Sequence, residues 1–368
     1  MKNSLKLITV AALSLLCGFG ASAQSSDPVF YDASVFPLQG KIEADTYDYY
    51  GRMPARLKDV VRKELWDLGR DAAGLYIRFR TNSTKITAKW NHLYGTSMNH
   101  QPTTGSRGLD LYIHNDGEWV FAGSGRPTGT SSSKATVISG MDGSMKECLL
   151  YLSLYDGVDS LYIGIDAGAQ ILQPELNSPK TDKPVIAYGT SILQGGCASR
   201  AGMAYTNIFT RKLDRTVINF GFSGNAHLDP EAAEFMASHS DPGAYLLDFG
   251  PNCTAERVAE RGEKFIRILR DAHPATPIIF VETQEYPYIV FDAKTRDSQP
   301  KVNAEIKKLY DACKKRGDKN VYYVECEGLI GDDAEGTVDG NHLTDLGMMR
   351  YADKVLPTLR KALKKSTK

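Results

Sequence analysis

The chain has 368 residues, 44 basic and 44 acidic side chains, and a formal net charge of zero. Its basic residues form no long run, which argues against a nucleic-acid partner or any other polyanionic partner. The length exceeds the ~100–200 residues of one typical domain, so two domains are expected. The sequence does not predict an oligomeric state.

The first residues have the pattern of a secretory signal peptide. Two lysines precede a short apolar run at 7–19, and Ala21-Ser22-Ala23 follows it. Cleavage is expected after Ala23, which predicts a periplasmic or secreted protein without residues 1–23. The apolar run is too short for a membrane span, and no later stretch reaches the ~20 apolar residues that a span needs.

Cysteine and histidine spacing gives no sign of a metal centre. The chain after residue 23 has an odd number of cysteines without C-x-x-C spacing, so at least one thiol is expected to stay unpaired within the chain. Most histidines are scattered without i,i+4 pairing, so no metal site is predicted, and no organic cofactor is expected. These cysteines are Cys148, Cys197, Cys253, Cys313 and Cys326.

Residues 24–167 are predicted to form an antiparallel β-sandwich. Short runs such as 75–80 and 85–90 are rich in aromatic and β-branched residues and alternate apolar with polar side chains, the period of a half-buried strand. Asn115-Asp116-Gly117 separates two such runs and is typical of a hairpin turn, because Asp-Gly adopts positive φ easily. Several short strands with turns between them favour a sandwich.

The sequence pattern changes after residue 167. Residues 168–183 contain several polar residues and two prolines, and they are predicted to be a surface linker. From 184 to 368, apolar strand-like runs alternate with helical patterns, among them 255–272 and 301–316. This alternation predicts a parallel sheet with helices on both faces, a three-layer α/β/α domain.

Ser191 follows the first strand-like run of this second domain, in Tyr188-Gly189-Thr190-Ser191-Ile192. Ligands of open parallel sheets bind at the carboxyl ends of the strands, so Ser191 stands where chemistry is expected. The segment fits neither the G-x-S-x-G motif nor a P-loop. Taken alone, a serine that caps a helix is an equally good interpretation.

A candidate base for this serine lies in Asp339-Gly340-Asn341-His342, before the last helical pattern. A serine hydroxyl is a poor nucleophile until a base takes its proton, and a carboxylate must hold the imidazole in the correct tautomer. Three-residue spacing lets Asp339 reach the ring of His342. A D-x-x-H segment that only caps a helix is commoner by itself, but the two segments together favour a catalytic triad.

Two further segments supply candidate oxyanion donors. Ser223-Gly224-Asn225 follows the second strand-like run, and Gly250-Pro251-Asn252 follows the third. A tetrahedral acyl intermediate has a negative oxygen that needs donors already in place, such as a glycine amide and an asparagine side chain. Each segment alone is typical of a turn. Four such segments at successive strand ends are harder to explain as turns only.

In these blocks the chain resembles the SGNH, or GDSL-like, hydrolases. Their first block is similar to Gly189-Thr190-Ser191, with threonine where the family often has aspartate, and their last block is similar to Asp339 and His342. The resemblance implies that Ser191 is the nucleophile, His342 the general base and Asp339 the residue that orients it. It also implies that Gly224 and Asn252 bind the oxyanion together with the Ser191 amide.

The resemblance extends to the first domain and has one departure in the second. Gly108-Leu109-Asp110-Leu111-Tyr112 matches the G-x-D-L-Y signature of a domain that precedes the catalytic domain in a lipase/acylhydrolase branch. Cys253 follows Asn252 where the family usually has aspartate, which removes the usual support of this donor.

The family resemblance implies a serine esterase that forms an acyl-serine intermediate. Together with the predicted export and the additional sandwich, it favours O-acetyl groups on carbohydrates as the substrate. The alternatives are a lipase or lysophospholipase that acts on lipid-like esters, and a non-catalytic glycan-binding protein on the same scaffold. A pure binding protein has no evident need for all five site residues.

A long loop in the first domain, His92–Pro102, is rich in aromatic and amide side chains. Loops of this kind often form binding rims, and Tyr94, Asn99 and His100 are predicted to contact the substrate. An ordinary surface loop is the alternative. On this hypothesis the first domain influences substrate choice more than it supports the chemistry.

Overall fold

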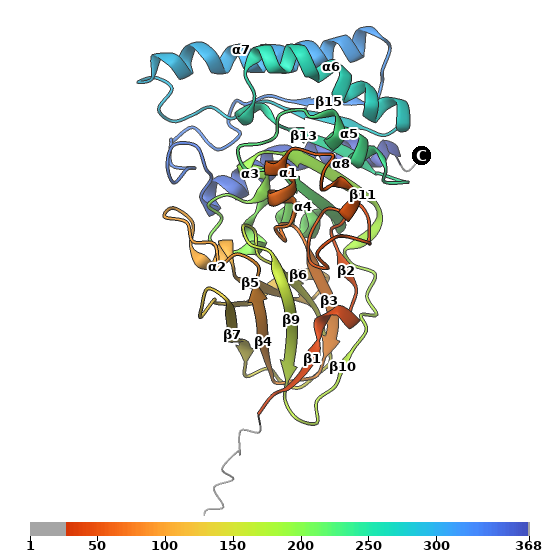
Figure 1. Ribbon diagram of the computed structural model, residues 1–368, viewed down its shortest axis with the longest axis vertical. Helices are drawn as coiled ribbons and strands as arrows, with labels where there is room; N and C mark the ends of the chain where they lie inside the picture. Colours follow the sequence, from red (N-terminus) through yellow and green to blue (C-terminus); the bar gives the residue numbers. More distant parts are fainter. Residues whose placement is uncertain (1–26, 367–368) are drawn as a thin grey trace, which may run out of the picture.

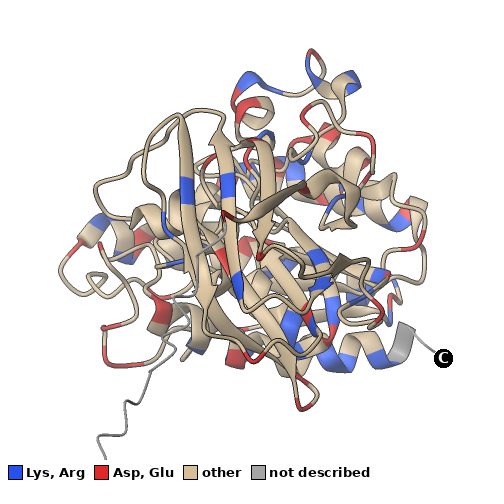
Figure 2. Cartoon of the chain, turned by 90° about the horizontal axis from the view of Figure 1, so that it is seen from below, with Lys and Arg blue, Asp and Glu red and all other residues tan. Residues whose placement is uncertain are grey.

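The computed structural model describes residues 27–366, in which a β-sandwich lies beside a layered α/β structure (Figure 1). The predicted signal peptide, residues 1–23, lies outside the described residues. Within 27–366, no helix has the length and apolar character to cross a membrane. Basic and acidic side chains are interspersed over the molecule (Figure 2).

Two antiparallel sheets form the sandwich. One has the strand order β1-β9-β4-β7, and the other has the order β10-β3-β8-β5-β6 with β2 beside β3. Asp116 and Gly117 adopt φ values of 48° and 87° in the turn between β5 and β6, as predicted. The strands are β1 (Val29–Asp32), β2 (Leu38–Gln39), β3 (Tyr76–Thr81), β4 (Lys85–His92), β5 (Leu109–Asn115), β6 (Glu118–Gly125), β7 (Ser132–Ser139), β8 (Lys146–Tyr151), β9 (Val158–Ile165) and β10 (Ile171–Leu172).

Five parallel strands in the order β12-β11-β13-β14-β15 form the third sheet. Helices α4 and α8 pack on one face, and α5, α6 and α7 pack on the other, which confirms the predicted three layers. The strands are β11 (Lys180–Gly189), β12 (Arg215–Gly221), β13 (Ala244–Asp248), β14 (Ile278–Val281) and β15 (Val321–Val324). The helices are α3 (Ser191–Gln194), α4 (Tyr205–Leu213), α5 (Pro230–Ala237), α6 (Ala255–Ala272), α7 (Ala293–Lys315) and α8 (Asp345–Ser366).

Part of the predicted surface linker 168–183 also forms strands, which its sequence pattern did not indicate. Ile171–Leu172 forms β10 and pairs with Arg80 and Thr81 at the edge of a sheet, and β11 already begins at Lys180. A two-residue edge strand gains its stability from the neighbouring strand, so its own sequence gives little signal. The division of the chain into two domains stays a prediction.

The N-terminal part and the α/β part share a hydrophobic core. Helix α1 (Lys63–Gly69) contributes Leu65 and Trp66 to the cluster that contains the faces of α5, α6 and α7. The fully buried guanidinium of Arg52 donates hydrogen bonds to the carbonyl oxygens of Asn219 and Gly221, each at 3.0 Å. Residues between β2 and β3 therefore help to fix the carboxyl end of β12. The chain also has α2 (Thr103–Ser106) and short 3-10 helices η1 (Ala33–Val35), η2 (Ala55–Leu57), η3 (Ala201–Met203) and η4 (Gly250–Asn252).

Candidate active site

The structure brings Ser191, His342 and Asp339 together beyond the carboxyl end of β11. Ser191 Oγ lies 2.9 Å from His342 Nε2, and His342 Nδ1 lies 2.7 Å from Asp339 Oδ2. Strand β11 is the point where the sheet order changes direction, because β12 and β13 flank it on opposite sides. Crevices that bind ligands form at such switch points.

Hydrogen bonds keep Asp339 ionised. Burial raises the pKa of Asp339, but hydrogen bonds from the ring and amide of His342 and from the amide of Asn341 outweigh burial and lower the pKa to about 2. An ionised Asp339 accepts a hydrogen bond from the Nδ1–H group and so leaves Nε2 of His342 free to take the proton of Ser191. The arrangement can therefore convert the serine hydroxyl into a nucleophile.

The residues that flank Ser191 have defined structural roles. Thr190 is the N-cap of α3, because its Oγ1 accepts a hydrogen bond from the Ile192 amide at 3.2 Å, so the interpretation of Ser191 as a cap was wrong. Gly196 lies against the imidazole, since a Cβ at this position would be 3.1 Å from Cδ2 of His342 and 2.9 Å from the hydroxyl of Tyr155. A larger residue would push the base away from the serine.

The two predicted oxyanion donors lie on the loops that follow β12 and β13. Gly224 has a φ of 69°, which favours glycine, and a Cβ on it would meet no atom within 4 Å. Asn252 Oδ1 accepts a hydrogen bond from the Ala226 amide at 3.2 Å, which leaves the side-chain amino group to donate. The Cys253 thiol donates to the Ala226 oxygen at 3.3 Å, so this cysteine supports the same loop.

Comparisons with known proteins decide the family. Residues 182–360 match the GDSL-like lipase/acylhydrolase family, and residues 29–171 match the N-terminal domain of SGNH-hydrolase-type esterases. A crystal structure of a GDSL-like lipase from Bacteroides ovatus is 36% identical, with 91% of this chain and 98% of that chain covered and a TM-score of 0.87. The chain belongs to the GDSL-like lipase/acylhydrolase family.

More distant structures share the fold of this GDSL-like hydrolase. A salicylyl-acyltransferase from a tetracycline biosynthetic pathway has a TM-score of 0.72 at 16% identity, over 91% of this chain and 97% of that chain. An acetyl xylan esterase from the rumen bacterium Butyrivibrio proteoclasticus has a TM-score of 0.58 at 12% identity, over 92% and 100%. No curated protein matches the chain significantly.

Side chains outside the predicted motifs hold the loops around Ser191 in this GDSL-like hydrolase, and sequence reasoning missed them. Tyr155 donates a hydrogen bond to the carbonyl oxygen of Ser191 at 2.9 Å. Gln194 Oε1 accepts a hydrogen bond from the Ser223 amide at 3.0 Å, and Gln194 Nε2 donates one to the carboxylate of buried Asp71 at 2.9 Å. These residues belong to no motif, and only the tertiary structure places them beside Ser191 and the Gly224 loop.

The G-x-D-L-Y motif connects the sandwich to the segment after Ser191 and α3. Asp110 is fully buried and accepts hydrogen bonds from the Arg200 guanidinium and the Gly202 amide, both at 2.8 Å. Tyr112 accepts a second bond from Arg200 at 2.7 Å. A Cβ on Gly108 would lie 2.3 Å from a backbone oxygen of the preceding helix. The motif therefore joins the two parts of the hydrolase next to α3.

The loop His92–Pro102 reaches the site with part of its length. The ring of His100 lies 5.4 Å from the ring of His342, and Asn99 Oδ1 lies 2.8 Å from His100 Nδ1. Tyr94 packs instead against the guanidinium of Arg70, 5.7 Å from the ring centre. The structure thus brings two of the three predicted substrate-contacting residues to the triad, and their binding role stays a prediction.

One cluster that includes His342 has the chemistry of a metal site. Within residues 27–366, His100, Cys197 and His342 offer ligand atoms that lie within 4.8 Å of one another. Burial, and then the charge of Asp339, raises the pKa of the Cys197 thiol to about 12. Sequence spacing gave no hint of this group, because its members come from three separate loops. A metal ion there would occupy His342 and compete with proton transfer.

Proposed function

We propose that this protein is an exported serine esterase that removes small acyl groups through an acyl-Ser191 intermediate. The observation that carries the proposal is the hydrogen-bonded series from Ser191 through His342 to Asp339, with Gly224 and Asn252 on adjoining loops. The signal-like N-terminus supports export.

The geometry supports a two-step mechanism. His342 Nε2 accepts the Ser191 proton as Oγ attacks the acyl carbonyl, and Asp339 stabilises the imidazolium that forms. The carbonyl oxygen becomes negative and receives hydrogen bonds from the Ser191 and Gly224 amides and from the Asn252 side chain. The Ser191 amide has no partner within its helix, because it is the first residue of α3. His342 then protonates the departing alcohol, and water releases the acyl group by the same steps in reverse.

An O-acetylated carbohydrate is the substrate that we propose. The imidazole of His100 and the side-chain amide of Asn99 lie beside His342, and both groups can form hydrogen bonds with sugar hydroxyls. Acetyl xylan esterase and family two carbohydrate esterases share the fold, so this architecture is compatible with ester groups on sugars.

Substrate competition assays test the proposal. The purified protein should hydrolyse 4-nitrophenyl acetate faster than the octanoate ester, and it should release acetate from acetylated xylan. Fatty-acid release from lysolipids without acetate release would replace the carbohydrate substrate by a lipid one. The absence of turnover on every ester would favour the glycan-binding alternative.

A further inference from the structure

A pocket of about 560 Å³ lies beside the proposed active site. Three elements form its walls: the segment from η4 to the start of α6, the loop after β14, and the N-terminal half of α7. Pro251 and Asn341 line it, and they precede Asn252 and His342 in the chain. The pocket therefore touches both the proposed oxyanion loop and the catalytic turn.

Side chains that line this pocket carry unpaired oxygen atoms. Thr283 Oγ1, Gln299 Oε1 and Asn341 Oδ1 have no hydrogen-bond partner, although the side chains of Thr283 and Gln299 are 2% and 5% exposed. A buried polar atom without a partner is costly. Two of these atoms are amide oxygens, which only accept, so a ligand that pairs with them must carry O–H or N–H donors, and sugar hydroxyls are such donors.

Aromatic rings form another part of the wall. Tyr286 and Tyr288 stack with ring centres 5.5 Å apart and an interplanar angle of 13°. The Tyr288 ring also packs on the catalytic turn, because a Cβ on Gly340 would lie 2.6 Å from it. Flat aromatic faces next to hydrogen-bond acceptors suit a sugar ring, whose C–H faces pack on the aromatic ring while its hydroxyls donate. An alkyl chain would leave the acceptors unpaired.

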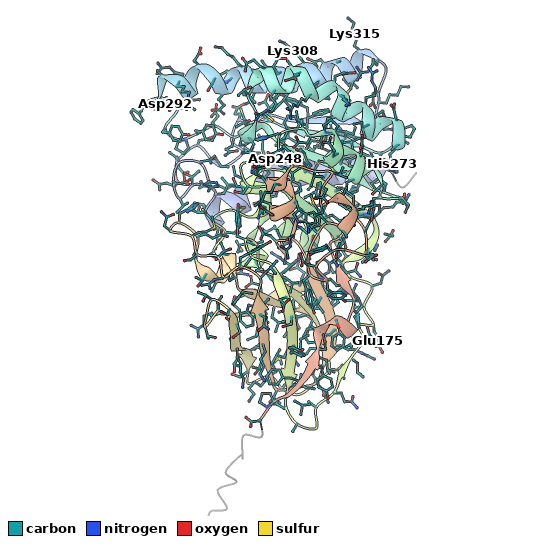
Figure 3. The ribbon with its side chains drawn as sticks, in the orientation of Figure 1. Glu175, Asp248, His273, Asp292, Lys308 and Lys315 are labelled. Carbon is teal, nitrogen blue, oxygen red and sulfur yellow. The ribbon has the colours of Figure 1, made fainter. Side chains whose placement is uncertain are left out.

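The apolar surface continues beyond the pocket. Val290 and Phe291 are 62% and 88% exposed, and they immediately precede Asp292, the N-cap of α7. Asp292 lies at the outer end of that helix, at the edge of the molecule (Figure 3). The loop after β14 thus leads from the triad to the outside, as a site for several linked sugar units requires.

The pocket floor is fixed and linked to the catalytic turn. Gln299 Nε2 donates to the Gln284 oxygen at 2.7 Å, and Asn303 Nδ2 donates to the Thr283 oxygen at 3.1 Å. Gln284 Nε2 in turn donates to the backbone carbonyl oxygen of Asn341 at 3.2 Å. These bonds fix the pocket wall relative to the catalytic turn, and such preorganisation favours binding.

We propose that this pocket is a subsite for the carbohydrate part of the ester substrate. The inference rests on the proposed function, because it assigns the leaving group of that reaction to a place in the fold. Its direct test measures sugar binding separately from turnover.

The test uses the Ser191→Ala variant, titrated calorimetrically with xylohexaose, cellohexaose and mannohexaose. Tyr288→Ala and Thr283→Val in that background should each weaken binding of the preferred sugar about tenfold. Thr283→Val should leave the melting temperature unchanged or higher, because the lost hydroxyl has no partner in the structure. Tyr162→Ala is the matched control, since Tyr162 is similarly exposed but lies on strand β9 of the sandwich.

The outcomes separate the subsite from the proposed reaction. Binding that weakens with both pocket variants and not with the control supports the subsite. Failure of all three sugars to bind, or equal binding by the pocket variants, overturns it even if the Ser191 enzyme hydrolyses 4-nitrophenyl acetate. Sugar binding without any ester hydrolysis by that enzyme would retain the subsite and overturn the proposed function.

Discussion

Replacing Tyr155 by phenylalanine tests whether the N-terminal part of the chain supports the chemistry. The Tyr155 hydroxyl donates to the Ser191 carbonyl oxygen, which also accepts the amides of Gly195 and Gly196 at 3.1 and 2.7 Å. Removing the hydroxyl leaves the carbonyl paired but loosens the backbone that carries the nucleophile. A net hydrogen bond contributes ~0.5–1.5 kcal/mol. If all of it is lost in the transition state, kcat falls by about twofold to about twelvefold.

The assay is steady-state hydrolysis of 4-nitrophenyl acetate, with kcat and KM measured separately. Tyr76→Phe is the matched control, because the Tyr76 hydroxyl is equally buried and bonds Thr216 Oγ1 at 2.6 Å across the same interface. Both variants should lose stability, and only Tyr155→Phe should lose kcat at nearly constant KM. An unchanged kcat in folded Tyr155→Phe, or equal losses in both variants, would refute the positioning role.

Three other perturbations follow from the site. Asp339→Asn should lower kcat by on the order of 10⁴, because it leaves His342 in the wrong tautomer. The pKa of Asp339 is about 2 in the folded protein against ~3.9 in the unfolded chain. Urea titrations should therefore show the wild type more stable than the variant at pH 7, and this advantage should be lost as the pH falls from about 4 to 2. Zn²⁺ should inhibit the enzyme through the cluster of His100, Cys197 and His342. In a dose–response assay with a chelator control, His100→Gln or Cys197→Ser should weaken that inhibition about tenfold or more. Equal inhibition of all forms would exclude zinc binding by this cluster. Asp110→Ala leaves a partly buried cation without its partner and should lower the free energy of unfolding by ~3–5 kcal/mol in denaturant titrations, and a loss below about 1 kcal/mol would contradict the structural role of the motif.

The sequence predicts the α/β elements well because each one combines a hydrophobic period with clear ends. Helix α6 has the predicted bounds, 255–272, and Thr254 caps it by accepting the Arg257 amide. Helix α7 begins at Ala293 rather than at 301, because Asp292 caps it and the helix continues through Pro300. Gln299, which lies in the additional turns, donates hydrogen bonds to the carbonyl oxygens of Thr283 and Gln284, and this packing on the loop after β14 helps to explain the earlier start.

The candidate site has residues that the sequence predicts and supporting residues that it does not predict. Short motifs at strand ends predicted Ser191, Gly224, Asn252, Asp339 and His342, because the chemistry requires these residue types and the topology brings strand ends together. The supporting residues Tyr155, Asp71 and Arg62 come from the N-terminal part and have no motif. Arg62 donates to both the Asn225 side chain and its carbonyl oxygen, at 2.9 and 3.0 Å. Such contacts depend on how two parts of the chain pack together, and local sequence patterns do not predict that packing.

The most direct measurement is the position of the covalent intermediate. The protein is mixed with 4-nitrophenyl acetate, quenched in acid during turnover, digested, and analysed by mass spectrometry. We predict one acetyl group on the peptide that contains Ser191. The Ser191→Ala variant should lack this label, and its kcat should be lower by a factor on the order of 10⁴ to 10⁶. Ser132→Ala, at an exposed serine of β7, should keep both. An acetyl group on another residue such as Cys197, or wild-type turnover by folded Ser191→Ala, would contradict the mechanism.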